Sequence, residues 1–176
     1  LKYPLFIKPM RAGSSFGITK VYEESNIEKA INEAFKYDSE IIIEENVDGI
    51  EVGCAVLGNE YLETGEIDEI ELSDGFFDFE EKYTLKTSKI YCPARIDKSM
   101  ADNIKQTAKK IYKILKCKDF ARVDMFLSKY NEIYFNEINT IPGFTSHSRY
   151  PNMMKQKGVE FKELVDRIII LELKAN

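Results

Sequence analysis

The sequence feature that most constrains the fold is a pair of apolar runs that each carry two polar side chains separated by one residue. The runs are residues 120–126 and residues 133–139, and the short polar break between them, residues 128–131, is typical of a turn. Two such runs joined by a turn predict a β-hairpin. Residues two apart on a strand point to the same face, so the polar side chains are expected to gather on one face of a sheet.

These polar side chains are Arg122, Asp124, Glu137 and Asn139. Carboxylates placed against apolar strands need compensation, and a hard cation with oxygen ligands provides it. Magnesium, which usually binds together with phosphates, is the natural candidate. In a plainer interpretation, Arg122 and Asp124 form a surface ion pair beside a solvated Glu137. Spacing alone does not decide between the two.

Composition is that of an ordinary globular protein: 176 residues, 44% hydrophobic and 31% charged, are enough for one domain or one and a half. The net charge of −5 gives no reason to expect affinity for nucleic acids or anionic membranes. Cys54, Cys92 and Cys117 form no CxxC pair and are expected to be ordinary thiols in a reducing compartment. We recognise no membrane span and no signal peptide. Because Leu1 is followed almost at once by a strand-like run, we expect the chain to be part of a longer protein.

Hydrophobic periodicity predicts short strands interleaved with helices. Further strands are expected at residues 5–8, 17–22, 40–47, 51–57, 60–62 and 90–93, and helices at residues 27–35, 99–115 and 161–173. Ser25 and Glu28 have the spacing of a capping box at the start of the first helix. Residues 65–88 are acidic and aromatic without clear periodicity, which is typical of a functional loop or lid. This mixture predicts an α+β fold with mainly antiparallel sheet.

A small polar loop follows Lys8, at the end of the first expected strand. The lysine suits a phosphate oxygen, and the backbone N–H groups around Gly13, Ser14 and Ser15 suit an anion-binding nest. The plainer interpretation is a solvated lysine at a strand end. The loop matches neither GxxxxGK[ST] nor GxGxxG.

Other polar residues also have two interpretations each. Lys82 and Tyr83, in the lid-like stretch, either close over charged groups of a substrate or belong to an exposed loop. Glu44 and Glu51 flank a turn and either hold the amine and ribose hydroxyls of a nucleotide or are solvated. The backbone N–H of Gly143, in a loop rich in hydroxyl groups, can face a developing oxyanion.

Four motifs occur in an order that carries a family resemblance. They are IKPMRAGSSFG at residues 7–17, EEKY at residues 80–83, RVD at residues 122–124 and NEINTIPGFTSHS at residues 136–148. Together they closely resemble the D-alanine–D-alanine ligases, of the ATP-grasp fold, over essentially the whole chain. The resemblance implies an α+β ATP-grasp fold, with mainly antiparallel sheets flanked by helices and the N-terminal domain absent. Residues 1–48 would be part of the central subdomain, and residues 49–176 the C-terminal catalytic domain.

The resemblance also implies binding of ATP and two magnesium ions. The residues for the phosphates, adenine and ribose are, in that order, Lys8, Glu44 with the backbone near Val47, and Glu51. The metal ligands are Asp124, Glu137 and Asn139. Arg122 and the Gly143 N–H would stabilise the transferring phosphate and the tetrahedral intermediate. Ser14 and Tyr83 would organise the lid and the first D-alanine. The residues facing the second substrate are Lys82, Ser148 and Arg149.

Arg149 departs from the pattern of D-Ala–D-Ala ligases, which usually carry an aliphatic residue after the TSHS segment. Arginine there resembles the D-alanine–D-serine ligases of vancomycin-resistance systems. A site built to hydrogen-bond a seryl hydroxyl loses binding energy with alanine. Tyr83 argues against D-lactate, since relatives that form depsipeptides often replace the lid tyrosine.

The expected function is therefore an ATP-dependent D-alanine–D-serine ligase, which forms a dipeptide for peptidoglycan precursors through D-alanyl phosphate. The resemblance implies a cytoplasmic homodimer whose partners are small D-amino acids, with no nucleic acid or membrane. The family's N-terminal part carries a glutamate for the first D-alanine and a second lysine for ATP, so this chain alone is expected to bind Mg-ATP weakly and to show little or no ligase activity. The alternatives are a D-alanine–D-alanine ligase, another ATP-grasp carboxylate–amine ligase, or an inactive nucleotide-binding fragment.

Overall fold

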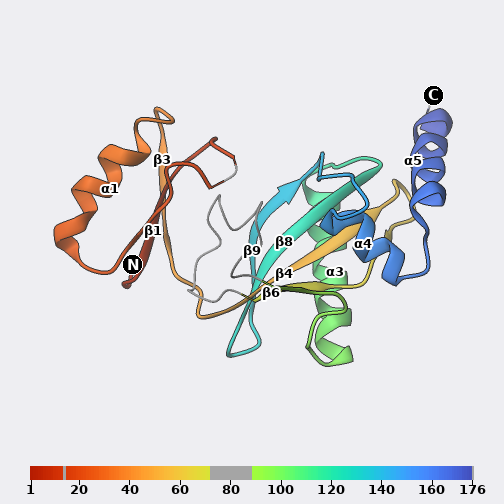
Figure 1. Cartoon of the computed structure of the whole chain (residues 1–176), viewed down its shortest axis with the longest axis horizontal. Helices are drawn as coiled ribbons and strands as arrows, with labels where there is room; N and C mark the ends of the chain where they lie inside the picture. The colour runs from red at the N-terminus through yellow and green to blue at the C-terminus, as the bar shows by residue number, and fades with distance from the viewer. Residues whose placement is uncertain (14, 72–88, 176) are drawn as a thin grey trace. The chain divides into compact units, whose positions relative to one another are not determined.

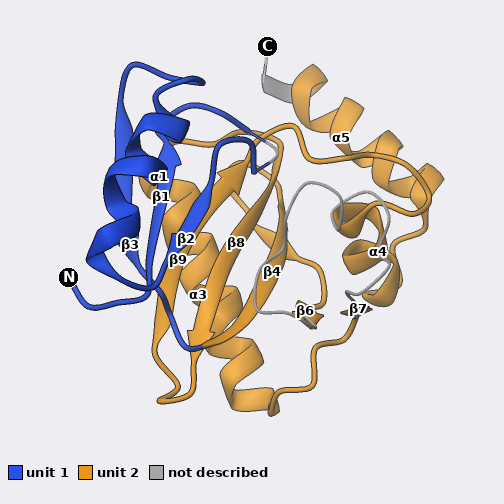
Figure 2. Ribbon diagram, turned by 60° about the vertical axis from the view of Figure 1, so that its left-hand side comes forward, with its two compact units in different colours: residues 1–48, 72–89 blue, residues 49–71, 90–176 orange. Residues whose placement is uncertain are grey.

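The structure, a computed structural model, describes residues 1–13, 15–71 and 89–175, with side chains up to residue 173 (Figure 1). The described chain divides into two compact units, residues 1–48 and residues 49–71 with 90–175, which Figure 2 shows in different colours. Each unit contains an antiparallel sheet flanked by helices. The predicted α+β class with mainly antiparallel sheets is therefore confirmed.

The first unit is a three-stranded sheet in the order β2-β1-β3, covered on one face by α1. Its elements are β1 (Leu5–Pro9), β2 (Thr19–Val21), the 3-10 helix η1 (Glu24–Asn26), α1 (Ile27–Ala34) and β3 (Ile41–Glu45). Ile7 is buried against the helix, while its neighbours Phe6 and Lys8 lie on the opposite face, as the two-residue period of a strand requires. In the register of β1 with β3, Phe6 lies opposite Glu44, so Glu44 shares that face.

The start of α1 corrects one prediction. Ser25 does not cap the helix from its N-terminal side, because it lies inside η1 and its hydroxyl donates to Glu23 Oε1 at 2.8 Å. The Asn26 amide donates to the same oxygen at 3.1 Å, and Asn26 is the N-cap residue, without a side-chain cap hydrogen bond in the described structure. The capping-box prediction for Ser25 and Glu28 is wrong because Ser25 lies in the 3-10 turn, bonds to Glu23, and leaves Asn26 as the N-cap residue of the helix.

The second unit is built on a larger sheet in the order β7-β6-β4-β8-β9, with β5 paired to β4. The strands are β4 (Gly49–Leu57), β5 (Glu63–Thr64), β6 (Asp68–Glu71), β7 (Lys89–Tyr91), β8 (Phe120–Ser128) and β9 (Ile133–Asn139). The helices are α3 (Lys98–Ile114), α4 (Arg149–Gln156) and α5 (Phe161–Ala175). None of the helices in the described ranges could span a membrane.

Alternate residues of β4 separate two cores. Val52, Cys54 and Val56 pack on one face with the buried stripe of α3. Ala55 and Leu57 pack on the other face with α4 and α5. The sheet therefore lies between two helical layers, and the part of its second face that α4 does not fill carries the polar residues described below.

Two elements of the second unit were not predicted. β6 lies in the stretch interpreted as aperiodic, and α4 follows directly after the loop that ends at Ser148. The hairpin partner predicted at residues 60–62 is instead β5, which pairs with Val56 and Leu57. Residues 72–88 of the predicted lid lie outside the described residues.

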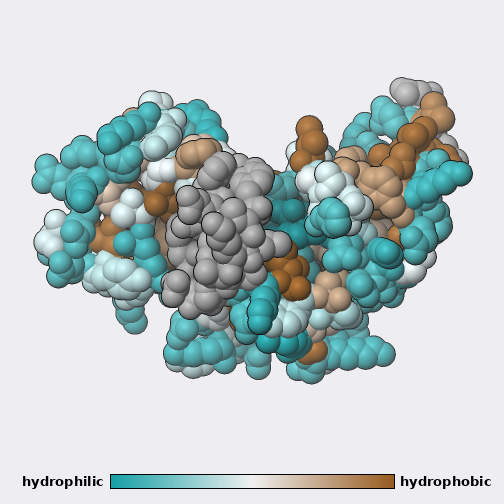
Figure 3. Space-filling model, viewed as in Figure 1, coloured by the Kyte–Doolittle hydropathy of each residue, from teal (hydrophilic) through white to brown (hydrophobic). Residues whose placement is uncertain are grey.

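α5 buries one side and exposes another apolar side. Leu164 is fully buried, and Ile168 and Leu171 pack against the same core. Ile169 and Leu173 are exposed, and Figure 3 shows hydrophobic colour along this helix at the surface.

Candidate active site

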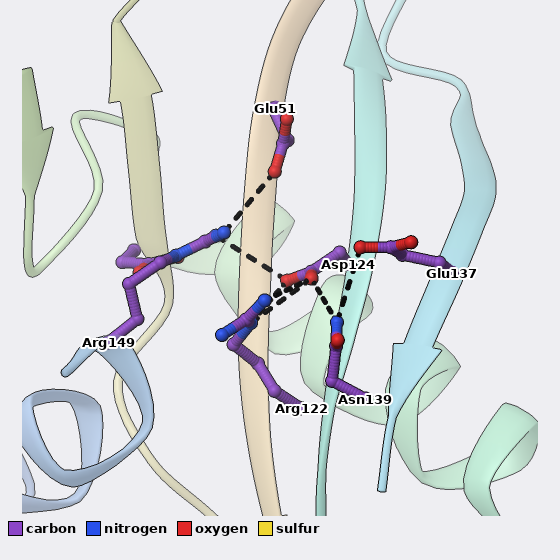
Figure 4. A network of polar contacts seen from close by, with 7 residues as sticks. Glu51, Arg122, Asp124, Glu137, Asn139 and Arg149 are labelled. Atoms are coloured by element: carbon purple, nitrogen blue, oxygen red, sulfur yellow. Dashed lines mark hydrogen bonds and ion pairs between the residues drawn. The ribbon is translucent and has the colours of Figure 1, made fainter. Parts of the chain in front are cut away.

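The predicted hairpin of β8 and β9 is confirmed, and its register brings the four polar residues together. Arg122 lies opposite Asn139, and Asp124 lies opposite Glu137. A register shift directly after Asp124 marks a β-bulge, an irregularity that often occurs beside functional sites. Figure 4 shows Arg122, Asp124, Glu137 and Asn139 converging from the two strands.

Asp124 is the centre of this cluster and is only 1% exposed. Arg122 donates to it through Nε at 2.8 Å and through Nη2 at 2.7 Å, which is a bidentate ion pair. The Asn139 amide donates to Asp124 Oδ2 at 2.8 Å and also reaches Glu137 Oε1 at 3.4 Å. The Arg122–Asp124 pair of the plainer interpretation is therefore present, but it is buried rather than superficial, and Glu137 is tied to it through Asn139.

Arg149 enters the same cluster from the start of α4. Its guanidinium forms a bidentate pair with Asp68 of β6, with Nε–Oδ2 at 2.7 Å and Nη2–Oδ1 at 2.8 Å. It also reaches Glu51 Oε1 at 3.3 Å and Asp124 Oδ1 at 3.5 Å (Figure 4). Burial alone would lower the pKa of Arg149, but the carboxylates of Asp68 and Asp124 raise it well above its usual value. The guanidinium is therefore a fixed positive charge between acidic strands.

Because Gly53 has no side chain, the Arg149 guanidinium can pack directly against its backbone. It pairs with Asp124 of β8 on one side and with Asp68 of β6 on the other. A Cβ atom at Gly53 would lie 2.5 Å from Arg149 Nη2 and 2.6 Å from Asp68 Oδ1. Any larger residue would therefore displace the Arg149–Asp68 pair.

The donor set around Asp124 fits a hard cation in composition. Asp124 and Glu137 supply carboxylate oxygens, and Asn139, which bonds both, carries an amide oxygen on the same side chain. In this structure the amide nitrogen faces the carboxylates, so coordination requires the amide to turn over. Among the described residues, no three His, Cys, Asp or Glu side chains form a metal-binding group. The predicted ligand set, with two carboxylates and one amide, is of a different kind.

The loop after β9 is closed by Ser148. Its hydroxyl accepts from the Thr145 backbone N–H at 3.0 Å and lies 2.9 Å from the Thr145 hydroxyl. Gly143 is exposed, and a Cβ atom there would lie 3.0 Å from Ser148 Oγ. Ser148 therefore shapes the loop that presents the Gly143 backbone.

The candidate nucleotide residues of the first unit lie on the face of its sheet that α1 does not cover. Lys8 Nζ pairs with Glu44 Oε2 at 2.7 Å, and both side chains are partly exposed. Val47 is partly buried two residues after β3. Glu51 belongs to the second unit, where it contacts Arg149. Ser14, Lys82 and Tyr83 lie outside the described residues.

Sequence reasoning missed Asp68 and Gly53. Asp68 is 1% exposed and stands in a segment whose acidic residues suggested a loop. Its partner Arg149 is 81 positions away, so no local pattern reveals the pair. The available signal was the isolated arginine after the TSHS segment, which needs an acidic partner once it is buried.

Comparisons with known proteins agree with this fold. The antiparallel sheets and helices are those of the ATP-grasp class of proteins. Residues 1–170 match the family described as the D-ala D-ala ligase C-terminus, and the chain belongs to this family.

Its relatives are ligases and vancomycin-resistance proteins. The chain is 47% identical to the vancomycin C-type resistance protein VanC2 of Enterococcus casseliflavus, over 96% of the chain and 48% of the relative. It is 45% identical to the D-alanine–D-alanine ligase of Caldicellulosiruptor bescii, over 99% of the chain and 48% of the relative. The crystal structure of the VanG D-Ala:D-Ser ligase from Enterococcus faecalis has a TM-score of 0.90 and 61% identity, over 97% of this chain and 50% of that chain. The chain thus spans about half the length of the relatives it matches.

Proposed function

We propose that the protein that contains this chain is an ATP-dependent D-alanine–D-serine ligase, and that this chain carries its nucleotide and magnesium sites. The observation that carries the proposal is that Arg122, Asp124, Glu137 and Asn139 converge on one face of the sheet. The chain also belongs to a family of ligases that join D-amino acids. A cytoplasmic homodimer acting on small D-amino acids is part of the proposal.

The proposed reaction has two steps. A carboxylate oxygen of D-alanine bonds to the γ-phosphorus of ATP and ADP leaves, which gives D-alanyl phosphate. The amine nitrogen of the second D-amino acid then bonds to the acyl carbon, phosphate leaves, and the nitrogen gives up a proton. Such catalysis depends on positioning and charge stabilisation rather than on a protein nucleophile.

Each candidate residue has a defined task in this scheme. Asp124, Glu137 and Asn139 would hold magnesium, which when bound would neutralise charge on the phosphate oxygens. Arg122 stabilises the transferring phosphoryl group, and the Gly143 N–H donates to the oxyanion of the tetrahedral intermediate. Lys8 exchanges its bond to Glu44 for phosphate oxygens, and Glu44 and the backbone near Val47 then receive adenine. Ser14 and Tyr83 organise the lid and the first D-alanine.

Arg149, Lys82 and Ser148 are proposed to face the second substrate, and Arg149 is the reason for choosing D-serine. Three of its N–H groups donate to Asp68 and Glu51, and the bidentate bond to Asp68 fixes the direction of the guanidinium. A guanidinium has five N–H groups, and Nη2 also faces Asp124 Oδ1 at 3.5 Å, so the described contacts leave one N–H, on Nη1, that can donate to a hydroxyl. The similarity to a D-Ala:D-Ser ligase favours the same choice.

The nucleotide part is tested by titrating the protein with ATP and Mg²⁺ in a calorimeter. We expect Asp124→Ala and Glu137→Ala to abolish measurable Mg-ATP binding, because each removes a proposed ligand of the metal that accompanies the phosphates. Glu132→Gln, at the exposed residue directly before β9, is the matched control and should bind like the wild type. Undiminished binding by both alanine variants would refute the metal assignment.

The substrate part is tested by the ratio of kcat/KM for D-serine to that for D-alanine at the second site. We expect Arg149→Leu to shift the ratio toward D-alanine by about 10-fold or more, since a charge-assisted hydrogen bond is lost. Arg149→Lys keeps the charge opposite Asp68 and serves if the leucine variant does not fold. Arg167→Lys, an arginine of α5 paired with Glu163, is the control. An unchanged ratio in a folded Arg149 variant would remove the reason for choosing serine.

A further inference from the structure

The loop between β9 and α4, residues 140–148, connects two side chains of the Asp124 cluster. It begins directly after Asn139, whose amide donates to Asp124 Oδ2 at 2.8 Å. It ends directly before Arg149, whose Nη2 lies 3.5 Å from Asp124 Oδ1. Both ends of the loop are therefore held at the cluster, and Gly143, the proposed oxyanion donor, lies between them.

The two halves of this loop are held in different ways. In the second half, the Ser148 N–H donates to the Thr145 carbonyl oxygen at 3.0 Å, and the Thr145 N–H donates to Ser148 Oγ at 3.0 Å. Within the part of the chain that the structure describes, residues 141–144 form no hydrogen bond. The first half, which carries Gly143, therefore depends on packing for its conformation.

The Phe144 side chain supplies this packing. Its ring lies against three other rings, each from a different element: Phe120 of β8 with 5.6 Å between ring centroids, Tyr150 of α4 with 5.8 Å, and Phe161 of α5 with 5.6 Å. Phe120 and Tyr150 also contact each other, with 5.6 Å between ring centroids. Centroid distances of about 4.5–7 Å are typical of attractive aromatic pairs. One strand and two helices of the second unit thus hold the Phe144 ring.

This ring cluster is fixed in turn to β4. Tyr150 is fully buried, and its hydroxyl donates to the Val56 carbonyl oxygen at 3.1 Å. Burial raises the pKa of Tyr150, so the hydroxyl stays protonated and keeps this bond. Pro142 is buried and Phe144 is partly buried, whereas Gly143 between them is exposed. An exposed backbone segment is therefore held by inward packing on both sides.

We propose that Phe144 is a positioning residue: its ring, held by Phe120, Tyr150 and Phe161, keeps the Gly143 N–H in the place where it meets the oxyanion of the tetrahedral intermediate. The inference rests on the proposed function, because it takes the Gly143 N–H to be the oxyanion donor. Phe144 does not need to touch the substrate. An oxyanion donor must be held in place before the charge develops, and a displacement of about 1 Å can cost about 100-fold in rate.

This role predicts an effect on kcat that a loss of stability alone does not produce. The oxyanion forms only during the reaction, so a displaced Gly143 N–H should lower kcat without weakening the binding of Mg-ATP. The proposed contacts of Mg-ATP are Lys8, Glu44, Glu51 and the residues around Asp124, none of which belongs to the ring cluster. The Kd for Mg-ATP should therefore stay unchanged.

The test measures two quantities on the intact protein that contains this chain. They are kcat for phosphate release with saturating Mg-ATP, D-alanine and D-serine, and the Kd for Mg-ATP from calorimetry. We expect Phe144→Ala to lower kcat by about 100-fold, the usual effect of losing one oxyanion donor, and to change the Kd for Mg-ATP by less than about 2-fold. Phe144→Leu fills part of the space left by the ring and should lower kcat by about 10-fold, and it serves if the alanine variant does not fold.

Ile104→Ala is the matched control. Ile104 of α3 is fully buried in the core on the other face of the sheet, so its truncation removes a comparable apolar contact without touching the ring cluster. It should lower the urea midpoint of unfolding about as much as Phe144→Ala does, while kcat stays within about 2-fold of the wild-type value.

The outcomes separate the inference from the proposed function. Phe144 variants with the kcat of the wild type would overturn the inference and leave the proposed function intact. An equal loss of kcat in Ile104→Ala, or a parallel rise in the Kd for Mg-ATP in the Phe144 variants, would show that Phe144 only stabilises the fold, and would also overturn the inference. A wild-type protein that releases no phosphate with D-alanine, alone or with D-serine, would refute the proposed function itself and the inference with it.

Discussion

At the scale of single residues, the site is defined by how its charges are compensated. Asp124 is almost fully buried and lies between two guanidinium groups, those of Arg122 and Arg149. Buried ion pairs gain little stability over apolar side chains of similar size, although removal of one partner is costly. A cluster of this kind is therefore better explained by the position that it gives to Asp124 than by the stability of the sheet.

Gly53→Ala tests whether the close approach at the centre of this cluster matters. The added methyl group would overlap Arg149 Nη2 and Asp68 Oδ1 and would force the ion pair apart. We expect the free energy of unfolding to fall by about 2 kcal/mol, the usual size of an overpacking effect. Urea denaturation followed by circular dichroism measures this change.

Gly13→Ala is the control for the same substitution in open space, since a Cβ atom there has no neighbour within 4 Å. Its unfolding midpoint should stay close to that of the wild type. If the two alanine variants were equally stable, the packing of Arg149 against Gly53 would not be as described.

At the scale of elements, sequence patterns predicted the helices and strands that depend only on neighbouring residues. The period of two and the turn of the β8–β9 hairpin are both local, and so is the helical period of α3, whose Ile104 and Ala108 are buried as expected. The face on which Arg122 and Asp124 meet Glu137 and Asn139 follows from strand geometry alone.

Elements that depend on contacts between residues far apart in the sequence were not predicted. β6 carries Asp68 and Glu69, both buried, because arginines much later in the chain compensate them. The sequence of this strand alone has three acidic residues among four, which suggested a loop. Pro151 lies in the first turn of α4, where the missing backbone N–H leaves no intrahelical hydrogen bond unmade. The Arg149–Asp68 pair could not be predicted because its two residues lie 81 positions apart in the sequence.

At the scale of the whole molecule, each unit contains a carboxylate held by an arginine. Asp38 accepts from Arg11 in the first unit, and Glu69 accepts from Arg95 in the second, with Arg95 Nη2–Glu69 Oε1 at 2.6 Å. The arginine hydrogen bond is the largest cause that lowers the pKa of each carboxyl group in the folded state. The unfolded state then binds more protons than the folded state at acidic pH, and acid favours unfolding.

The free energy of unfolding should therefore be constant from pH 7 to about pH 5 and fall below about pH 4.5, the range in which these carboxyl groups are protonated in the unfolded chain. Glu69→Gln removes one of the linked groups. It should be less stable than the wild type at pH 7, because Arg95 loses its charged partner, and its loss of stability between pH 5 and pH 3 should be smaller. Urea midpoints across this pH range measure both effects, with Glu28→Gln on the exposed side of α1 as the control for loss of one negative charge. An acid limb of undiminished slope in Glu69→Gln would mean that the Arg95 bond does not lower the pKa of Glu69 and that other groups govern acid unfolding.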